Sequence, residues 1–126
     1  MIVDDHAAIR RMVRAMFEAE DWEVSDAANG AEAVQRAQAV KPSLIILDLS
    51  MPVMNGLDAA RRLKVLMPQV PLLMFTNHAG GMIEREARSA GISALVSKSD
   101  SNAPTQLLAH AKALLAPDGA DVPRTS

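Results

Sequence analysis

Acidic residues follow two apolar segments of the sequence, and their side chains could do chemistry together. Asp4 and Asp5 come directly after Ile2-Val3, and Asp48 follows the apolar run 44–47. Three carboxylates in one place carry a charge of about −3 and repel one another unless a cation neutralises them. Mg²⁺ suits such a group, since it binds one or two carboxylates, a phosphate and several waters. A carboxylate can also act as the nucleophile of phosphoryl transfer and form an aspartyl phosphate.

Two further polar side chains would complete a site for phosphoryl transfer. Thr76 ends a later apolar segment, and Lys98 follows the last one. The oxygens of a phosphoryl group need a hydroxyl donor and a cation, which these residues offer. Each acidic or basic residue also has an ordinary explanation: Asp5 could cap a helix, Asp48 could begin a loop, and Lys98 could be a solvated charge. The combination of all of them, in this order, favours one shared site.

The apolar pattern alternates between strands and helices along the chain. Strands are expected at residues 2–3, 22–27, 44–48, 70–76 and 92–96, and helices at 9–17, 29–40, 57–67, 82–90 and 103–116. This alternation predicts an α/β fold, in which five parallel strands form a sheet with helices on both faces. Ligands bind at the carboxyl ends of the strands in such sheets. The acidic residues, the threonine and the lysine all follow strand ends, so we expect them to meet there.

The composition excludes several classes of protein. The 126 residues fit one domain, and the absence of Cys excludes disulfides, thiolate metal sites and Cys nucleophiles. Thirteen basic against fifteen acidic residues give a net charge of −2, which argues against direct binding of nucleic acid. No secretory signal or membrane-spanning run is visible, so we expect a cytoplasmic protein without a membrane partner. Residues 117–126 lack apolar periodicity, so we expect a domain at 1–116 and a disordered tail or linker after it.

Four segments together resemble the receiver domain of two-component response regulators. They are Ile2-Val-Asp-Asp-His6, the run from Leu44 through Asp48 and Pro52 to Gly56, Met74-Phe-Thr76 and Val96-Ser-Lys98. The resemblance covers residues 1 to about 116. It implies a flavodoxin-like sheet with strand order 2-1-3-4-5, as in the chemotaxis regulators.

The resemblance also implies a role for each site residue. Asp48 would accept a phosphoryl group from a phosphohistidine on a histidine kinase or phosphotransfer protein. Asp5 and Asp48 would bind Mg²⁺ directly, Asp4 would bind it through water, and Ser50 would contribute its backbone carbonyl. Thr76 and Lys98 would bind the phosphoryl group. A downstream partner would dock on the face formed by the fourth helix, fifth strand and fifth helix.

Several residues depart from the pattern of the receiver family. The aromatic residue that usually stands three positions before the lysine is Leu95 here, which puts the aromatic part of the switch in question. Asn77 stands where a small residue usually follows the threonine, and Ser99 stands where a proline often follows the lysine. The first strand is also shorter than usual.

Other functions remain open at this stage. A Mg²⁺-dependent phosphohydrolase with an Asp nucleophile usually has Asp-x-Asp, whereas Ser50 occupies that third position here. An interaction module that no longer switches is the main alternative, suggested by Leu95 and Asn77. The three histidines, at positions 6, 78 and 110, lack metal-ligand spacing and are not expected to bind a metal.

Overall fold

A computed structural model describes residues 1–77 and 80–116, and its five parallel strands form one sheet in the order β2-β1-β3-β4-β5. The strands are β1 (Ile2–Val3), β2 (Asp26–Ala27), β3 (Ile45–Leu47), β4 (Leu72–Thr76) and β5 (Ala94–Ser97). The helices are α1 (Ala7–Glu18), α2 (Gly30–Val40), α3 (Gly56–Leu66), α4 (Gly81–Ser89) and α5 (Ala103–Leu115). The structure confirms both the predicted α/β class and the predicted strand order.

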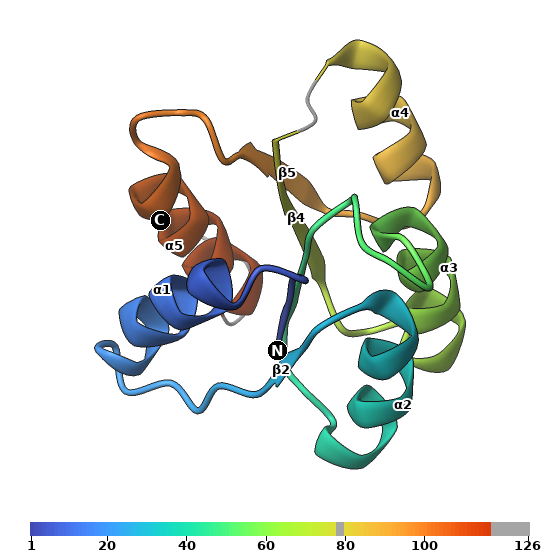
Figure 1. The fold of residues 1–126 in the computed structure, drawn as a ribbon, viewed down its shortest axis with the longest axis horizontal. Coiled ribbons are helices and arrows are strands. Elements are labelled where there is room, and N and C mark those ends of the chain that lie inside the picture. Colours follow the sequence, from blue (N-terminus) through green and yellow to red (C-terminus); the bar gives the residue numbers. More distant parts are fainter. Residues whose placement is uncertain (78–79, 117–126) are drawn as a thin grey trace.

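The helices cover both faces of the sheet, as Figure 1 shows: α1 and α5 lie on one face, and α2, α3 and α4 lie on the other. Successive side chains of β4 point to opposite faces. Leu73 and Phe75 therefore join the apolar cluster under α1 and α5, while Leu72 and Met74 join the cluster under the other three helices. A strand buried on both faces reads as a continuous apolar run, which explains why β3 and β4 were visible in the sequence.

Asparagine side chains cap the N-termini of two of the helices. The Asn29 side chain accepts a hydrogen bond from the Glu32 backbone N–H, and the Asn55 side chain accepts one from Asp58 in the same way. The pair Asn29 and Glu32 resembles a capping box, although the Glu32 carboxylate accepts from the N–H of Ala28 rather than of Asn29. These caps fix the loops that precede α2 and α3.

The second strand is shorter than predicted. Residues 22–25 are not part of β2, which contains only Asp26 and Ala27. The register places Ile2 of β1 opposite Asp26, so residues 22–24 lie beyond the first residue of β1 and have no ladder partner there. The apolar side chain of Trp22 instead stacks on Phe17 of α1, with ring centroids 5.0 Å apart. Trp22 is therefore apolar because it packs against α1, and not because it pairs in the sheet.

The fifth strand begins two residues later than predicted. Ile92 is buried, but its backbone N–H donates to the carbonyl of Ala87 and so closes the end of α4. Gly91, with φ of +97°, supplies the left-handed turn between α4 and the strand. β5 therefore starts at Ala94.

The loop after β3 contains a strained valine, which leads to a stability prediction. Val53 has φ of +71° and is 84% exposed, so its β-branched side chain adopts a costly conformation and gains little packing. We expect Val53→Gly to raise the free energy of unfolding by up to about 1 kcal/mol in urea denaturation, because glycine adopts this conformation without steric cost. Val65 is a matched control, since it is 82% exposed within α3. Val65→Gly should lower stability instead, and a loss of stability in Val53→Gly would contradict the strain argument.

None of the helices within residues 1–77 and 80–116 is long and apolar enough to cross a bilayer.

Candidate functional site

The ends of four neighbouring strands bring the predicted residues together at one edge of the sheet. Asp4 follows β1, Asp48 follows β3, Thr76 ends β4, and Lys98 follows β5. The pairing continues beyond the strands, since the N–H of Asp48 donates to the carbonyl of Val3 and the N–H of Lys98 donates to that of Thr76, each at 2.9 Å. The sheet register therefore sets the spacing of these four side chains.

A buried lysine links the two buried carboxylates. Lys98 Nζ lies 2.6 Å from Asp4 Oδ2 and 3.4 Å from Asp48 Oδ2. All three side chains are less than a tenth exposed. The ammonium also lies 5.7 Å from the centroid of the Phe75 ring, within the range of a cation–π contact. Because charges out of water are costly alone, the three groups stabilise one another as a unit.

Burial raises the pKa of Asp48 above its usual range, and the nearby Asp4 carboxylate raises it further. The Lys98 ammonium, a hydrogen bond from Thr76 and the backbone N–H of Leu49, 2.8 Å from Oδ1, lower the same pKa without cancelling the effect of burial. The positive charge of Lys98 therefore does not fully offset the cost of burying the ionised Asp48 carboxylate. A cation added beside it would relieve this cost.

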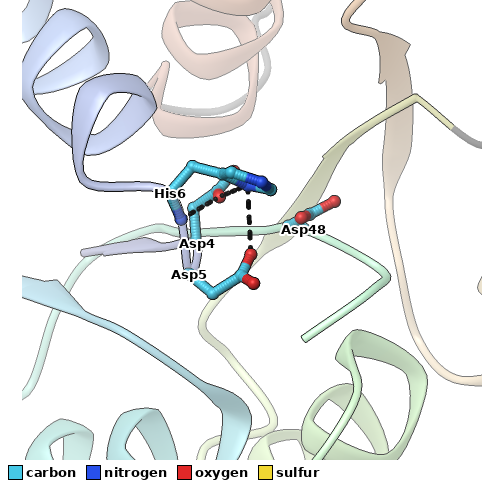
Figure 2. A group of neighbouring side chains, drawn as sticks. All are labelled: Asp4, Asp5, His6 and Asp48. Atoms are coloured by element: carbon cyan, nitrogen blue, oxygen red, sulfur yellow. Dashed lines mark hydrogen bonds and ion pairs between the residues drawn. The ribbon is translucent and has the colours of Figure 1, made fainter. Parts of the chain in front are cut away.

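Four side chains offer a set of atoms that could hold a metal ion. One atom each from Asp4, Asp5, His6 and Asp48 lies within 4.8 Å of all the others, and Figure 2 shows the four side chains as neighbours. Three carboxylates are a suitable donor set for a hard divalent cation such as Mg²⁺. The carboxylates predicted as metal ligands are thus brought together.

An open hollow of about 460 Å³ lies beside these carboxylates. It is lined by Asp5, Leu49, Ser50, Met51 and Asn55. Ser50 is exposed and lines the same hollow as Asp5. The binding of Mg²⁺ by the Ser50 carbonyl stays a prediction. The hollow therefore meets the acidic group at Asp5.

The structure also places His6 in this cluster, a residue that the sequence analysis does not expect to bind a metal. His6, and not Asp5, occupies the N-cap position of α1, and its side chain makes no capping hydrogen bond. Its backbone N–H donates to Asp4 Oδ1 at 2.9 Å, and its Nδ1 lies 3.1 Å from both Asp4 Oδ1 and Asp5 Oδ1. Its position directly after two acidic residues at a helix start was the available signal, which a search for metal-ligand spacing overlooks.

The residues that depart from the receiver pattern lie close to the site but not in its ion-pair network. Leu95 of β5 is half-buried and packs against the cluster under α2, α3 and α4, and Asn77 is exposed. No peptide bond within residues 1–77 and 80–116 is cis, including the one before Ser99. His110 is exposed on α5, away from the acidic group, and His78 lies outside the described residues.

Gly56 permits the close approach of α3 to the end of β3. A Cβ at this position would lie 2.1 Å from the carbonyl oxygen of Asp48, which is backbone and cannot move aside. Gly56 N also donates to the carbonyl of Leu49 at 2.8 Å. Glycine is therefore required for the loop to close over the site residue.

A second and larger hollow, of about 780 Å³, contains none of the predicted site residues. Its lining includes Met1, Trp22, Val24, Pro42 and Leu115, at the edge of the sheet opposite Asp48. Its size alone does not outweigh the convergence of charged groups at the carboxyl edge.

Comparisons of the sequence and of the structure with known proteins agree on one family. Residues 1–112 match the family profile of the response regulator receiver domain. The transcriptional activator protein ExaE of Pseudomonas putida is 35% identical over 92% of this chain and 54% of its own length. A protein-glutamate methylesterase/protein-glutamine glutaminase of Vibrio parahaemolyticus is 41% identical over 72% of this chain and 26% of its own length. The chain thus spans about half or less of these curated relatives. The structure of the chemotaxis protein CheY4 of Vibrio cholerae superposes with a TM-score of 0.84 and 30% identity, covering 90% of this chain and 95% of that one.

Proposed function

The chain belongs to the response regulator receiver domain family, and on this basis we propose that it is a phosphorylation-controlled switch with Asp48 as its phosphoacceptor. The observation that carries the proposal is the geometry of Lys98, whose Nζ contacts both Asp4 and Asp48 where the strands end. An ammonium in this position can contact a phosphoryl group on Asp48 while the Lys98 backbone stays fixed just after β5. Members of this family are generally phosphoacceptors in signalling and not enzymes that turn over a separate substrate.

The reaction that we propose transfers a phosphoryl group from a phosphohistidine of a kinase or phosphotransfer protein. One carboxylate oxygen of Asp48 forms a bond to phosphorus, the bond from phosphorus to the donor nitrogen breaks, and that nitrogen keeps the electron pair and takes up a proton. Lys98 and the Thr76 hydroxyl bind the phosphoryl oxygens. Mg²⁺, when bound, adds positive charge beside the transferred group; Asp5, Asp48 and the Ser50 carbonyl would hold it, with Asp4 acting through water.

We expect Mg²⁺ to stabilise the folded protein through these acidic residues. A ligand that binds only the folded state raises stability by about 2.7 kcal/mol at a hundredfold excess over its Kd. The melting temperature of the wild type should therefore rise with Mg²⁺ concentration, and that of Asp5→Ala should not. Asp58→Ala is the control, because Asp58 is an exposed acid on α3 outside the site. Equal stabilisation of Asp5→Ala and the wild type would contradict the proposed ligand role.

The proposed output face consists of α4, β5 and α5. These elements follow Thr76 and flank Lys98, so a change at the phosphorylation site reaches them directly through the backbone. Met82 of α4 is 70% exposed on this part of the surface and is available for an apolar contact. We propose a downstream partner on this face, a cytoplasmic location and a receiver unit at residues 1–116. The expected disordered tail or linker at 117–126 lies outside the described residues.

A module that no longer switches is the second candidate, and Leu95 is the observation that favours it. Leucine lacks the ring and hydroxyl that the family's aromatic residue uses. In an active switch without that residue, we expect the movement to fall on the segment after Thr76 and on α4, because leucine repacks at little cost.

Amide hydrogen exchange with and without beryllofluoride and Mg²⁺ separates these two candidates. A switch should change protection across residues 76–90, with coupling of about 1–2 kcal/mol. Asp48→Asn with the same reagents serves as the control and should show no change. Protection that is unchanged across residues 76–90 in the wild type would favour the module that does not switch.

A further inference from the structure

His6 adds a nitrogen donor to the acidic group, at a position that suits a metal ligand. His6 Nδ1 lies 3.1 Å from Asp4 Oδ1 and 3.1 Å from Asp5 Oδ1, so this one nitrogen contacts both carboxylates. Together with an Asp48 oxygen, these atoms form a set in which every pair is within 4.8 Å. One cation could therefore contact the ring nitrogen and the carboxylates at the same time.

Backbone hydrogen bonds fix the position of the His6 Cα. The N–H of His6 donates to Asp4 Oδ1 at 2.9 Å, and the His6 carbonyl accepts from Arg10 N at 3.1 Å in the first turn of α1. The side chain itself is 66% exposed, so the ring can turn about its own bonds while the Cα stays in place. The ring needs no rearrangement of the fold to reach a cation among the carboxylates.

The choice of ion follows from the chemistry of the donors. Carboxylate and water ligands suit Mg²⁺, whereas imidazole suits Zn²⁺, Ni²⁺ and the other later first-row ions. A neutral imidazole binds through the nitrogen that has no hydrogen. In the metal-free arrangement Nδ1–H donates to the carboxylates, because a carboxylate only accepts. On binding of an ion, the hydrogen would move to Nε2, which the exposed ring leaves in contact with water.

We propose that His6 is a protein ligand for divalent transition ions at this site and shifts its selectivity away from Mg²⁺ alone. The proposal rests on the proposed function, because it takes the acidic group to be a metal site. His6 Nδ1 and carboxylate oxygens of Asp4, Asp5 and Asp48 would bind a Co²⁺, Ni²⁺ or Zn²⁺ ion, while Mg²⁺ would use the carboxylates and water. The site would thus respond to the identity of the metal as well as to its presence.

Isothermal titration of the full chain with MgCl₂ and separately with CoCl₂ tests this selectivity. His6→Ala should lower the affinity for Co²⁺ by about tenfold or more, in the range for loss of an important contact in a metal site. The affinity for Mg²⁺ should change by less than about threefold, because Mg²⁺ gains little from imidazole. A purely structural role, in which His6 only positions Asp4 and Asp5, would weaken both ions equally and overturn the proposal.

The proton spectrum of the Co²⁺-loaded protein provides a direct and independent readout. A ring bound through Nδ1 should give a strongly shifted, non-exchangeable ring Cδ2–H resonance, which should be absent in His6→Ala. His78→Ala and His110→Ala account for the other two histidines of the chain and should retain the resonance. Absence of the resonance in the wild type, or its persistence in His6→Ala, overturns the proposal.

The two titrations separate failure of this proposal from failure of the proposed function. A protein that binds Mg²⁺ and takes up a phosphoryl group, but shows no difference in Co²⁺ affinity between wild type and His6→Ala, refutes only the role of His6. A wild type that binds neither ion refutes both.

Discussion

The Asp48→Asn protein should take up no phosphoryl group from acetyl phosphate and Mg²⁺, whereas the wild type should gain the mass of one. Asn has no carboxylate oxygen with which to form the acyl phosphate, yet it has nearly the same size and can keep the hydrogen bond from Leu49 N. The fold should survive, because Lys98 keeps its shorter contact, 2.6 Å, with Asp4. Intact-mass spectrometry measures the result. Asp58→Asn, which changes an exposed acid on α3, should be labelled like the wild type.

A change of stability with pH should accompany the loss of labelling. The pKa of Asp48 is raised by burial in the folded state above its unfolded value of 3.8. A group of this kind contributes stability below the unfolded pKa and loses that contribution as the pH rises through the folded pKa. In metal-free buffer at neutral pH, Asp48→Asn should therefore be at least as stable as the wild type, and the difference should disappear in acid. Normal labelling of the variant, or a stability loss at neutral pH alone, would contradict the assignment.

The Lys98→Met protein should lose about 3 kcal/mol or more of its free energy of unfolding in metal-free buffer. Methionine retains the apolar stem but removes the ammonium that contacts both Asp4 and Asp48. Breaking a buried ion pair costs about 3–5 kcal/mol, because the remaining charges stay buried without a partner. Urea denaturation at neutral pH measures the loss.

Conditions that neutralise the remaining carboxylates should partly restore the Lys98→Met protein. With the lysine gone, the folded pKa of Asp48 rises further, so stability should increase as the pH falls toward that pKa. Mg²⁺ should act in the same direction. Lys112 is the matched control, because its pair with Glu20 at 2.8 Å lies on the surface. Lys112→Met should change stability by only about 0.5 kcal/mol or less. Equal losses in the two variants would show that Lys98 is not part of a buried network.

Much of the fold could be predicted from the sequence because its signals are local. The apolar runs of β3 and β4 and the periodicity of the helices are decided by neighbours within a few residues. The order of the strands came from the family resemblance, and the structure confirms it. The length of β2 could not be read in this way. Its apolar residues suggested a longer strand, whereas the register with Ile2 decided where pairing starts.

The candidate site shows the same division between local and tertiary information. The sequence identified Asp4, Asp48, Thr76 and Lys98 from their places at strand ends, because the carboxyl ends of parallel strands must share one edge. It could not reveal that Lys98 contacts both carboxylates, since the contact with Asp4 joins residues 94 positions apart. Nor could it show that His6 turns toward Asp4 and Asp5. A side-chain direction at a helix start depends on the packing around it, so only the tertiary structure decided which neighbouring charges meet.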